Sequence, residues 1–157
     1  MTDDRERSVP GSPFPVPGSQ SIPDSRFPIP DGWGRGSGYS HAVTAEGRIV
    51  VIAGQIGWDP VTLVLAEGGL VAQTRQALSN IATVLAAAGS APAQLVRLTW
   101  FVTDRDAYLR DRKAIGSVYR EVMGRYFPAM SVIFVSSLVE PGAVVEIEAT
   151  AVIPSAP

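Results

Sequence analysis

The segment over residues 144–153 constrains the fold of this chain more than any other part. Its residues alternate in character, and successive side chains of a β-strand point to opposite faces of a sheet. The residues on one face are all apolar: Val145, Ile147, Ala149 and Ala151. The residues on the other face include two carboxylates: Val144, Glu146, Glu148, Thr150 and Val152. The pattern predicts a strand that packs only its first face against helices.

Two segments upstream carry the three- and four-residue periodicity of amphipathic helices. The first stripe consists of Val71, Thr74, Leu78, Ile81, Leu85 and Ala88. The second consists of Tyr108, Ile115, Val118, Val122 and Tyr126. Gly89 is the expected end of the first helix, and Pro128 of the second. Asp104 or Asp106 is the expected N-cap of the second helix.

Short β-favouring runs complete the pattern: 39–43, 48–55, 94–102 and 131–135. Glu46 and Gly47 form a plausible hairpin turn between the first two runs. The predicted order is ββαβαββ, an α+β domain with a mixed sheet and both helices on one face. The other face would expose apolar side chains, among them Val144 and Val152 beside Val132 and Phe134 or their alternates. Self-association through that face is therefore expected.

The composition excludes several classes of function. The 157 residues suit one domain, and 13 basic against 15 acidic residues give a net charge of −2 without a clustered basic run. Nucleic acid and an anionic membrane are therefore not expected as partners. There is no cysteine and a single histidine, so we expect no thiolate or multi-histidine metal site and no cofactor.

The N-terminal 38 residues differ in composition from the rest of the chain. Residues 1–38 hold seven of the 13 prolines, mixed with Gly and Ser. Such a segment is typical of an extension, flexible over residues 1 to about 20, that precedes a domain over 39–154. Phe27 and Trp33, among other apolar residues, suggest that part of it lies along the domain. Because no apolar core follows the charged start, it is not a secretory signal, and a cytoplasmic location is expected.

Four motifs occur in an order that resembles the YjgF/RidA (reactive-intermediate deaminase, Rid) family. They lie at 39–43, 53–56, 127–131 and 144–151, and the resemblance covers about 39–153. It implies a chorismate-mutase-like homotrimer whose pockets lie between subunits. It also implies a small-molecule substrate: the best-known members hydrolyse imines and enamines derived from amino acids.

The resemblance also implies which residues line the pocket. Glu146 takes the place of the glutamate that holds the attacking water, together with the backbone carbonyl at Gly54. Tyr39 takes the place of the pocket aromatic residue. Gln55 belongs to the same motif as Gly54, and Trp58 follows it, where it could close the pocket mouth or simply be a core or interface aromatic residue.

Three departures from the family pattern all remove polar groups. Met130 stands where the imine deaminases carry an arginine that grips the substrate carboxylate, which a thioether cannot do. Ala53 replaces the usual serine, and Gly116 replaces a polar residue three positions before the helix tyrosine. A pocket altered in this way favours a less charged ligand, or has lost catalysis.

Other interpretations of the polar residues remain open. Alternating glutamates on a strand often form a solvated face, although a carboxylate buried at an oligomer interface suits general acid/base catalysis. Glu148 is more simply part of a structural ion pair. His41 lies on the same side of its segment as Tyr39, and its chemistry suits proton transfer. A lone histidine is nevertheless more often a hydrogen-bonded structural residue.

Two functional hypotheses follow. One is an enzyme that acts on a small non-carboxylate imine, enamine or enol by hydrolysis, tautomerisation or ring closure. The other is a non-catalytic trimer that binds a small apolar ligand in the same pocket. The glycine-rich run over 32–38 is a weak match to a phosphate loop, because it neither follows a strand nor opens a helix.

Overall fold

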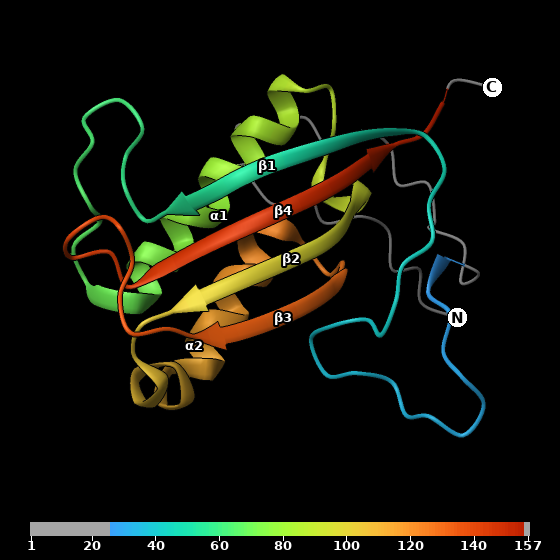
Figure 1. The fold of residues 1–157 in the computed structure, drawn as a ribbon, viewed down its shortest axis with the longest axis horizontal. Coiled ribbons are helices and arrows are strands. Elements are labelled where there is room, and N and C mark those ends of the chain that lie inside the picture. Colours follow the sequence, from blue (N-terminus) through green and yellow to red (C-terminus); the bar gives the residue numbers. More distant parts are fainter. Residues whose placement is uncertain (1–25, 156–157) are drawn as a thin grey trace, which may run out of the picture.

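The computed structural model describes residues 26–155 (Figure 1). Residues 1–25 and 156–157 lie outside the described part. The expected flexibility of residues 1 to about 20 concerns that undescribed part. The elements are β1 (Arg48–Ile56), α1 (Gly69–Ala87), the 3₁₀ turn η2 (Pro92–Gln94), β2 (Leu95–Val102), α2 (Arg105–Met123), β3 (Ala129–Phe134) and β4 (Val145–Ile153).

The strands form one mixed sheet in the order β1-β4-β2-β3. Strand β4 runs antiparallel to both β1 and β2, whereas β2 and β3 are parallel. A parallel pair needs a crossover connection, and α2 provides it. Both helices lie on one face of the sheet (Figure 1), as predicted.

The core lies between that face and the helices. Val145, Ile147 and Ala151 of β4 are fully buried, which confirms the predicted alternation. They pack with the predicted helix stripes, including Leu78 and Ile115. Burying such side chains contributes roughly 1.5–3 kcal/mol each, so this face of β4 fixes the register of the sheet.

The helix ends follow local chemistry. Asp104 is the N-cap of α2, and its carboxylate accepts a hydrogen bond from the Ala107 N–H at 2.8 Å. Helix α2 ends at Met123, because Gly124 adopts a φ of +78°, so the expected end at Pro128 is wrong by several residues. Helix α1 ends at Ala87, close to the predicted stop.

The run over 39–43 is not a strand and forms no hairpin with β1. Among the described residues, its backbone pairing with the sheet is a parallel bridge between Ser40 and Ala129, at the start of β3. The Ser40 N–H donates to the Pro128 carbonyl at 3.0 Å, and its hydroxyl donates to the Phe127 carbonyl at 2.5 Å. Because β3 and β1 are opposite edges of the sheet, a segment held beside β3 cannot pair with β1.

The sheet face away from the helices carries exposed apolar side chains, as expected, but Val144 and Val152 are not among the exposed ones. Val152 is buried, and Val144 packs partly against the core. The exposed residues are Ile49, Val51 and Ile133, at 66%, 78% and 42% exposure. The expectation of an uncovered apolar face is therefore met, with Ile133 as the alternate of Val132 and Phe134 on β3, and with Ile49 and Val51 of β1 in place of Val144 and Val152.

Candidate functional site

Gly54 and Glu146 lie next to each other across β1 and β4. Glu146 pairs with Ile56 on one side and with Phe101 of β2 on the other. A Cβ atom at Gly54 would overlap the Glu146 side chain, including a carboxylate oxygen. Glycine at this position therefore leaves the space that the carboxylate occupies. Glu146 is half-buried there, on the face of the sheet that the helices do not cover.

The strand is irregular beside this carboxylate. The β1–β4 register shifts between Ile52 and Gln55, which takes Ala53 and Gly54 out of the regular ladder. A bulge of this kind leaves backbone groups unpaired and re-aims them. The Gln55 side-chain amide donates to the Ala53 carbonyl at 3.2 Å and lies 3.5 Å from the Gly54 carbonyl. Two backbone carbonyls and a carboxylate, all of them hydrogen-bond acceptors, thus belong to residues that are neighbours in the structure.

Two buried amides of α1 support this region from behind. The Gln73 side chain accepts a hydrogen bond from the Val144 N–H at 2.9 Å, two residues before Glu146. The Asn80 side chain donates to the Trp58 carbonyl at 2.9 Å, in the loop that follows β1. Both side chains are about 5% exposed. Water cannot replace them as hydrogen-bond partners, so without these amides the backbone groups of the two loops would be buried and unpaired.

A second group of predicted residues lies near the start of β3. Tyr39, His41 and Met130 line a shallow cavity of about 240 Å³. The rings of Tyr39 and His41 meet edge to face at 5.4 Å, which agrees with their expected placement on one side of the segment. Met130 pairs with Leu98 of β2 and packs partly against the helix-side core.

His41 has a structural role in this segment. Its Nε2 lies 2.9 Å from the Gly34 carbonyl and, because a carbonyl only accepts, Nε2 donates the hydrogen bond. The imidazole also meets the Trp33 ring edge to face at 5.2 Å. These contacts hold the loop over 33–41 together, which favours the structural interpretation of this histidine.

The two groups do not meet within one chain. Glu146 is in register with Phe101, and Met130 is in register with Leu98. Three residues along a strand span about 10 Å, and an odd offset places the side chains on opposite faces. One chain therefore contains two halves of the predicted site.

Gly116 and Trp58 do not line the cavity beside Met130. Gly116 is on α2, where the nearest atom to an added Cβ would be a guanidinium nitrogen of Arg120 at 3.4 Å. Trp58 is half-buried in the loop after β1 and forms an isolated bridge with Leu65.

The expected ion pair of Glu148 is not formed within the described residues. Glu148 is exposed, and the ion pairs of residues 26–155 join Arg75 to Glu121 and two sequence-adjacent pairs on α2. The Arg75–Glu121 pair is bidentate, at 2.6 and 2.8 Å, and links the two helices on the solvent side.

Two buried phenols fix the turn that leads into β3. The Tyr119 hydroxyl donates to the Tyr126 carbonyl at 2.7 Å, and the Tyr126 hydroxyl donates to the Leu95 carbonyl at 2.5 Å. Burial raises the pKa of both phenols above its ordinary value. Tyr119 also stacks on Phe127, with ring centroids 5.3 Å apart. The backbone that carries Met130 is thereby anchored.

The described range, residues 26–155, holds neither a metal-ligand cluster nor a membrane-spanning helix. No three His, Asp or Glu side chains of that range come together as metal ligands. No helix of the range combines the length and the apolar composition that crossing a membrane requires.

Sequence reasoning missed three side chains that shape these regions. Gln73 and Asn80 lie beside the apolar stripe of α1, where a polar residue with helical spacing is easily taken for a boundary residue. A buried amide within a stripe is the available signal, because it requires a partner. Arg35 lies inside a glycine-rich run that gives no sign of a site, although it lines a cavity with Tyr39.

The chain is similar to known proteins over most of its length. Residues 35–153 match the family described as Endoribonuclease L-PSP. A goat protein named 2-iminobutanoate/2-iminopropanoate deaminase is 39% identical over 114 residues, which are 73% of this chain and 79% of that protein. Protein DfrA of Myxococcus xanthus is 39% identical over 119 residues, covering 73% and 84%.

A solved structure gives the same result. The crystal structure of the Rid-family protein YyfB from Yersinia pestis, described as a protein of unknown function, superposes with a TM-score of 0.66. It is 39% identical to this chain and covers 74% of it, while this chain covers 87% of that protein.

Proposed function

Because this chain belongs to the YjgF/RidA (Rid) family, we propose that it is an acid/base catalyst acting on a small, uncharged imine, enamine or enol. The reaction class is hydrolytic deamination, with tautomerisation and ring closure as chemically related steps. The observation that carries the proposal is the placement of the Glu146 carboxylate against the bulged backbone at Gly54.

The geometry suits activation of a water. Carbonyls at the bulge orient the water, and Glu146 accepts its proton as the oxygen attacks the imine carbon. The proton then passes to the imine nitrogen, which leaves as ammonia while a carbonyl product forms. One water is consumed for each imine, and no redox change or cofactor is needed for this step.

The choice of an uncharged substrate rests on the residues that replace polar groups. Met130 offers no charge to a carboxylate, and Ala53 and Gly116 offer no hydrogen bond from a side chain. A substrate carboxylate placed there would lose its hydration without a partner. An apolar or neutral group fits a thioether well.

Assembly is part of the same proposal. The half with Glu146 and the half with Met130 lie about 10 Å apart along the strands and on opposite faces of the sheet. A homotrimer would allow one subunit to supply Glu146 and its neighbour to supply Met130. The exposed Ile49, Val51 and Ile133 are suited to such an interface.

A non-catalytic binding trimer is the second candidate. It is favoured by the same three replacements, since a pocket without an anchoring charge binds small apolar molecules but positions a reactive group poorly. Glu146 distinguishes the two candidates, because a binding protein has no need of a proton acceptor beside the bulge.

The experiment measures ammonia release from imines that an oxidase generates in situ from neutral amines. Glu146→Gln keeps the shape and should lower the rate by about 10²–10⁴-fold. Glu148→Gln is the matched control: it lies on the same strand and face, is exposed, and should leave the rate within twofold (about 0.4 kcal/mol). Equal activity of Glu146→Gln and the parent chain would refute the enzyme.

A further inference from the structure

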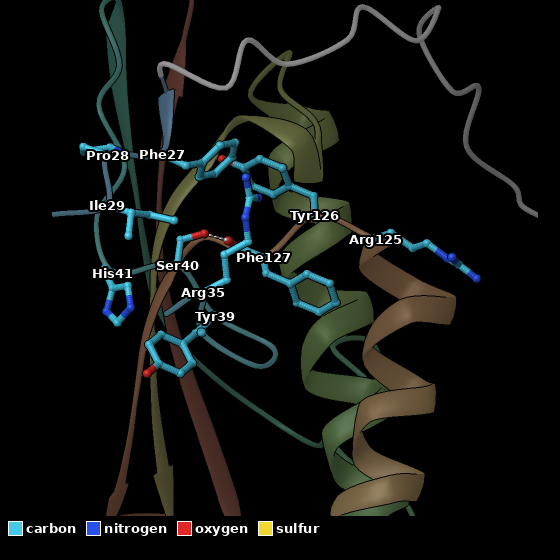
Figure 2. Close-up of a pocket in the computed structure, with 11 residues that line it drawn as sticks. Phe27, Pro28, Ile29, Arg35, Tyr39, Ser40, His41, Arg125, Tyr126 and Phe127 are labelled. Carbon is cyan, nitrogen blue, oxygen red and sulfur yellow. Dashed lines mark hydrogen bonds between the residues drawn. The ribbon is translucent and has the colours of Figure 1, made fainter. Parts of the chain in front are cut away.

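A cavity of about 340 Å³ lies between the segment over 27–41 and the turn over 125–127 (Figure 2). Its volume is within the range of small-molecule sites. Its wall is rich in aromatic side chains, with Phe27, Tyr126 and Phe127 contributed by the two segments. It is separate from the region around Glu146, which does not line it.

Arg35 provides the charge of this cavity. In Figure 2 its side chain extends toward the rings of Phe27 and Tyr126, whereas the Arg125 side chain points away. Arg35 forms no ion pair with any residue of 26–155. No Asp or Glu is among the described residues that line the cavity. The site therefore presents a guanidinium whose counter-charge the described part of the chain does not supply.

The loop that carries Arg35 is fixed on both sides. His41 binds the Gly34 carbonyl at 2.9 Å. On the other side, a Cβ at Gly36 would overlap the backbone carbonyl and the ring of Tyr39, so the close turn there requires glycine. A guanidinium on a braced loop needs less ordering when it binds a ligand than one on a free loop.

The polar groups beside Arg35 are largely occupied. The Ser40 hydroxyl donates to the Phe127 carbonyl, which leaves it as an acceptor. Tyr126 uses its hydroxyl to donate to the Leu95 carbonyl. A ligand would therefore meet one charged donor directed into the cavity, beside aromatic side chains, a combination that suits an anion with a flat or branched apolar body.

We propose that this cavity binds a small monocarboxylate with an aromatic or branched aliphatic body. The carboxylate lies against the Arg35 guanidinium and the apolar body lies against Phe27 and Phe127. The site adjoins the Met130 half of the proposed catalytic pocket, because Tyr39, Ser40 and His41 line both cavities, but Arg35 and Phe27 line only this one. Its occupation does not depend on Glu146.

The test uses the full-length protein with benzoate and its neutral analogue benzamide, at constant ionic strength. Backbone amide shifts followed by NMR should change over 35–41 and 125–127 on addition of benzoate. Arg35→Gln should weaken benzoate binding by at least about tenfold, as loss of a charged hydrogen bond implies, and leave benzamide unaffected. Arg125→Gln, which removes the outward-pointing arginine, should change benzoate binding by less than about twofold (0.4 kcal/mol).

Three outcomes would overturn the assignment. The first is the absence of shifts over these residues at millimolar benzoate. The second is equal weakening by the Arg35 and Arg125 variants, which would indicate general electrostatics. The third is binding of inorganic phosphate as strong as that of benzoate, which would show that the aromatic wall contributes nothing. Glu146→Gln should bind benzoate as the parent does, so failure of the proposed catalysis and failure of this site are distinguishable.

Discussion

Gly54 and Glu146 share one small space: the carboxylate of the glutamate lies where any other residue at position 54 would place its Cβ. The pairing depends on the bulge in β1, which re-aims the backbone beside β4. A residue with no side chain thus leaves the space in which the carboxylate of its neighbour lies. Substitutions on β1 are therefore expected to report on β4.

Gly54→Ala should abolish most turnover while the fold survives. The added methyl overlaps the Glu146 carboxylate, which is the flexible end of a side chain and can turn away. The loss of a positioned proton acceptor corresponds to roughly 10²–10⁴ in rate. Ammonia release and thermal unfolding measure the two effects. Gly116→Ala is the control for a glycine-to-alanine change away from Glu146. It should stabilise α2 by about 0.5–1 kcal/mol, because glycine within a helix is less favourable than alanine. Full activity of Gly54→Ala would contradict the proposed role of Glu146.

The protein should sediment as a homotrimer of about 50 kDa, the size of three 16.6 kDa chains. Val51→Lys should dissociate it, because Val51 is 78% exposed on the uncovered sheet face and burying an ammonium there is costly. Val139→Lys is the control, since Val139 is 99% exposed in a loop. Sedimentation equilibrium at micromolar concentration distinguishes these species. A monomeric parent protein would disprove the assembly.

Turnover of 2-aminoacrylate-type acids should be poor. Without a guanidinium at Met130, a buried carboxylate loses about 2–5 kcal/mol of interaction, which is roughly 30- to several thousand-fold in rate. Met130→Arg should recover part of this activity if its long side chain reaches past the β3 edge. Steady-state rates on 2-iminopropionate, compared with those on a neutral imine, provide the measurement. A parent rate on the acid that equals the rate on the neutral imine would rule out the proposed preference.

Stability should decrease above pH 10 because of Tyr119 and Tyr126. Burial raises the pKa of both phenols in the folded state, so the folded protein holds these protons more tightly than the unfolded chain. Their contribution is complete below the unfolded pKa of about 10 and is lost as pH rises toward the folded values, by up to roughly 1.4 kcal/mol per pH unit for each phenol. Urea unfolding at pH 8, 10 and 11 measures the slope.

Tyr119→Phe separates the two contributions. It should cost about 1 kcal/mol at pH 8, because the hydrogen bond to the Tyr126 carbonyl is lost. Above pH 10 it should reduce the slope by about half, since only one raised phenol remains. A slope identical to that of the parent would show that Tyr119 is not the group responsible.

Removing residues 1–25 should leave the unfolding free energy unchanged, whereas removing 1–30 should lower it by roughly 1–3 kcal/mol. The second deletion takes away Phe27, whose ring lies 5.6 Å from that of Tyr126, and Arg26, which donates to the Ala93 carbonyl at 3.1 Å. Both shortened chains should still fold and assemble. Equal denaturation midpoints for the two deletions would show that this packing contributes nothing.

Periodicity predicted most of the fold because burial decides it. The stripe containing Leu78 and the alternation around Ile147 each leave one arrangement that buries all their apolar groups. The run over 39–43 was predicted wrongly, because Ser40 pairs it with the backbone at Phe127 and Pro128, a long-range pairing that local pattern does not encode. The end of α2 was misplaced because Gly124, rather than Pro128, adopts the conformation that stops a helix.

The candidate site could be predicted from the sequence only in part, because it also depends on long-range pairing. Motif order was sufficient to select Gly54 and Glu146, which the structure brings together. It could not show that Met130 lies on the opposite face of the sheet, because that depends on the register of β2 with β3. Arg35 lacked a local pattern altogether: its neighbours in space come from a turn about 90 residues away in sequence.

The separation of Glu146 from Met130 within one chain has a consequence for inheritance. Consider an assembly that completes each pocket from two subunits. One allele can alter the half that contains Glu146, and another can alter the half near Tyr39. The two alleles then affect opposite sides of the pocket. Subunits from both alleles, mixed in one ring, would rebuild some intact pockets from their undamaged sides. Two strains that each lack activity could therefore produce progeny that regain part of it, without any repair of either gene.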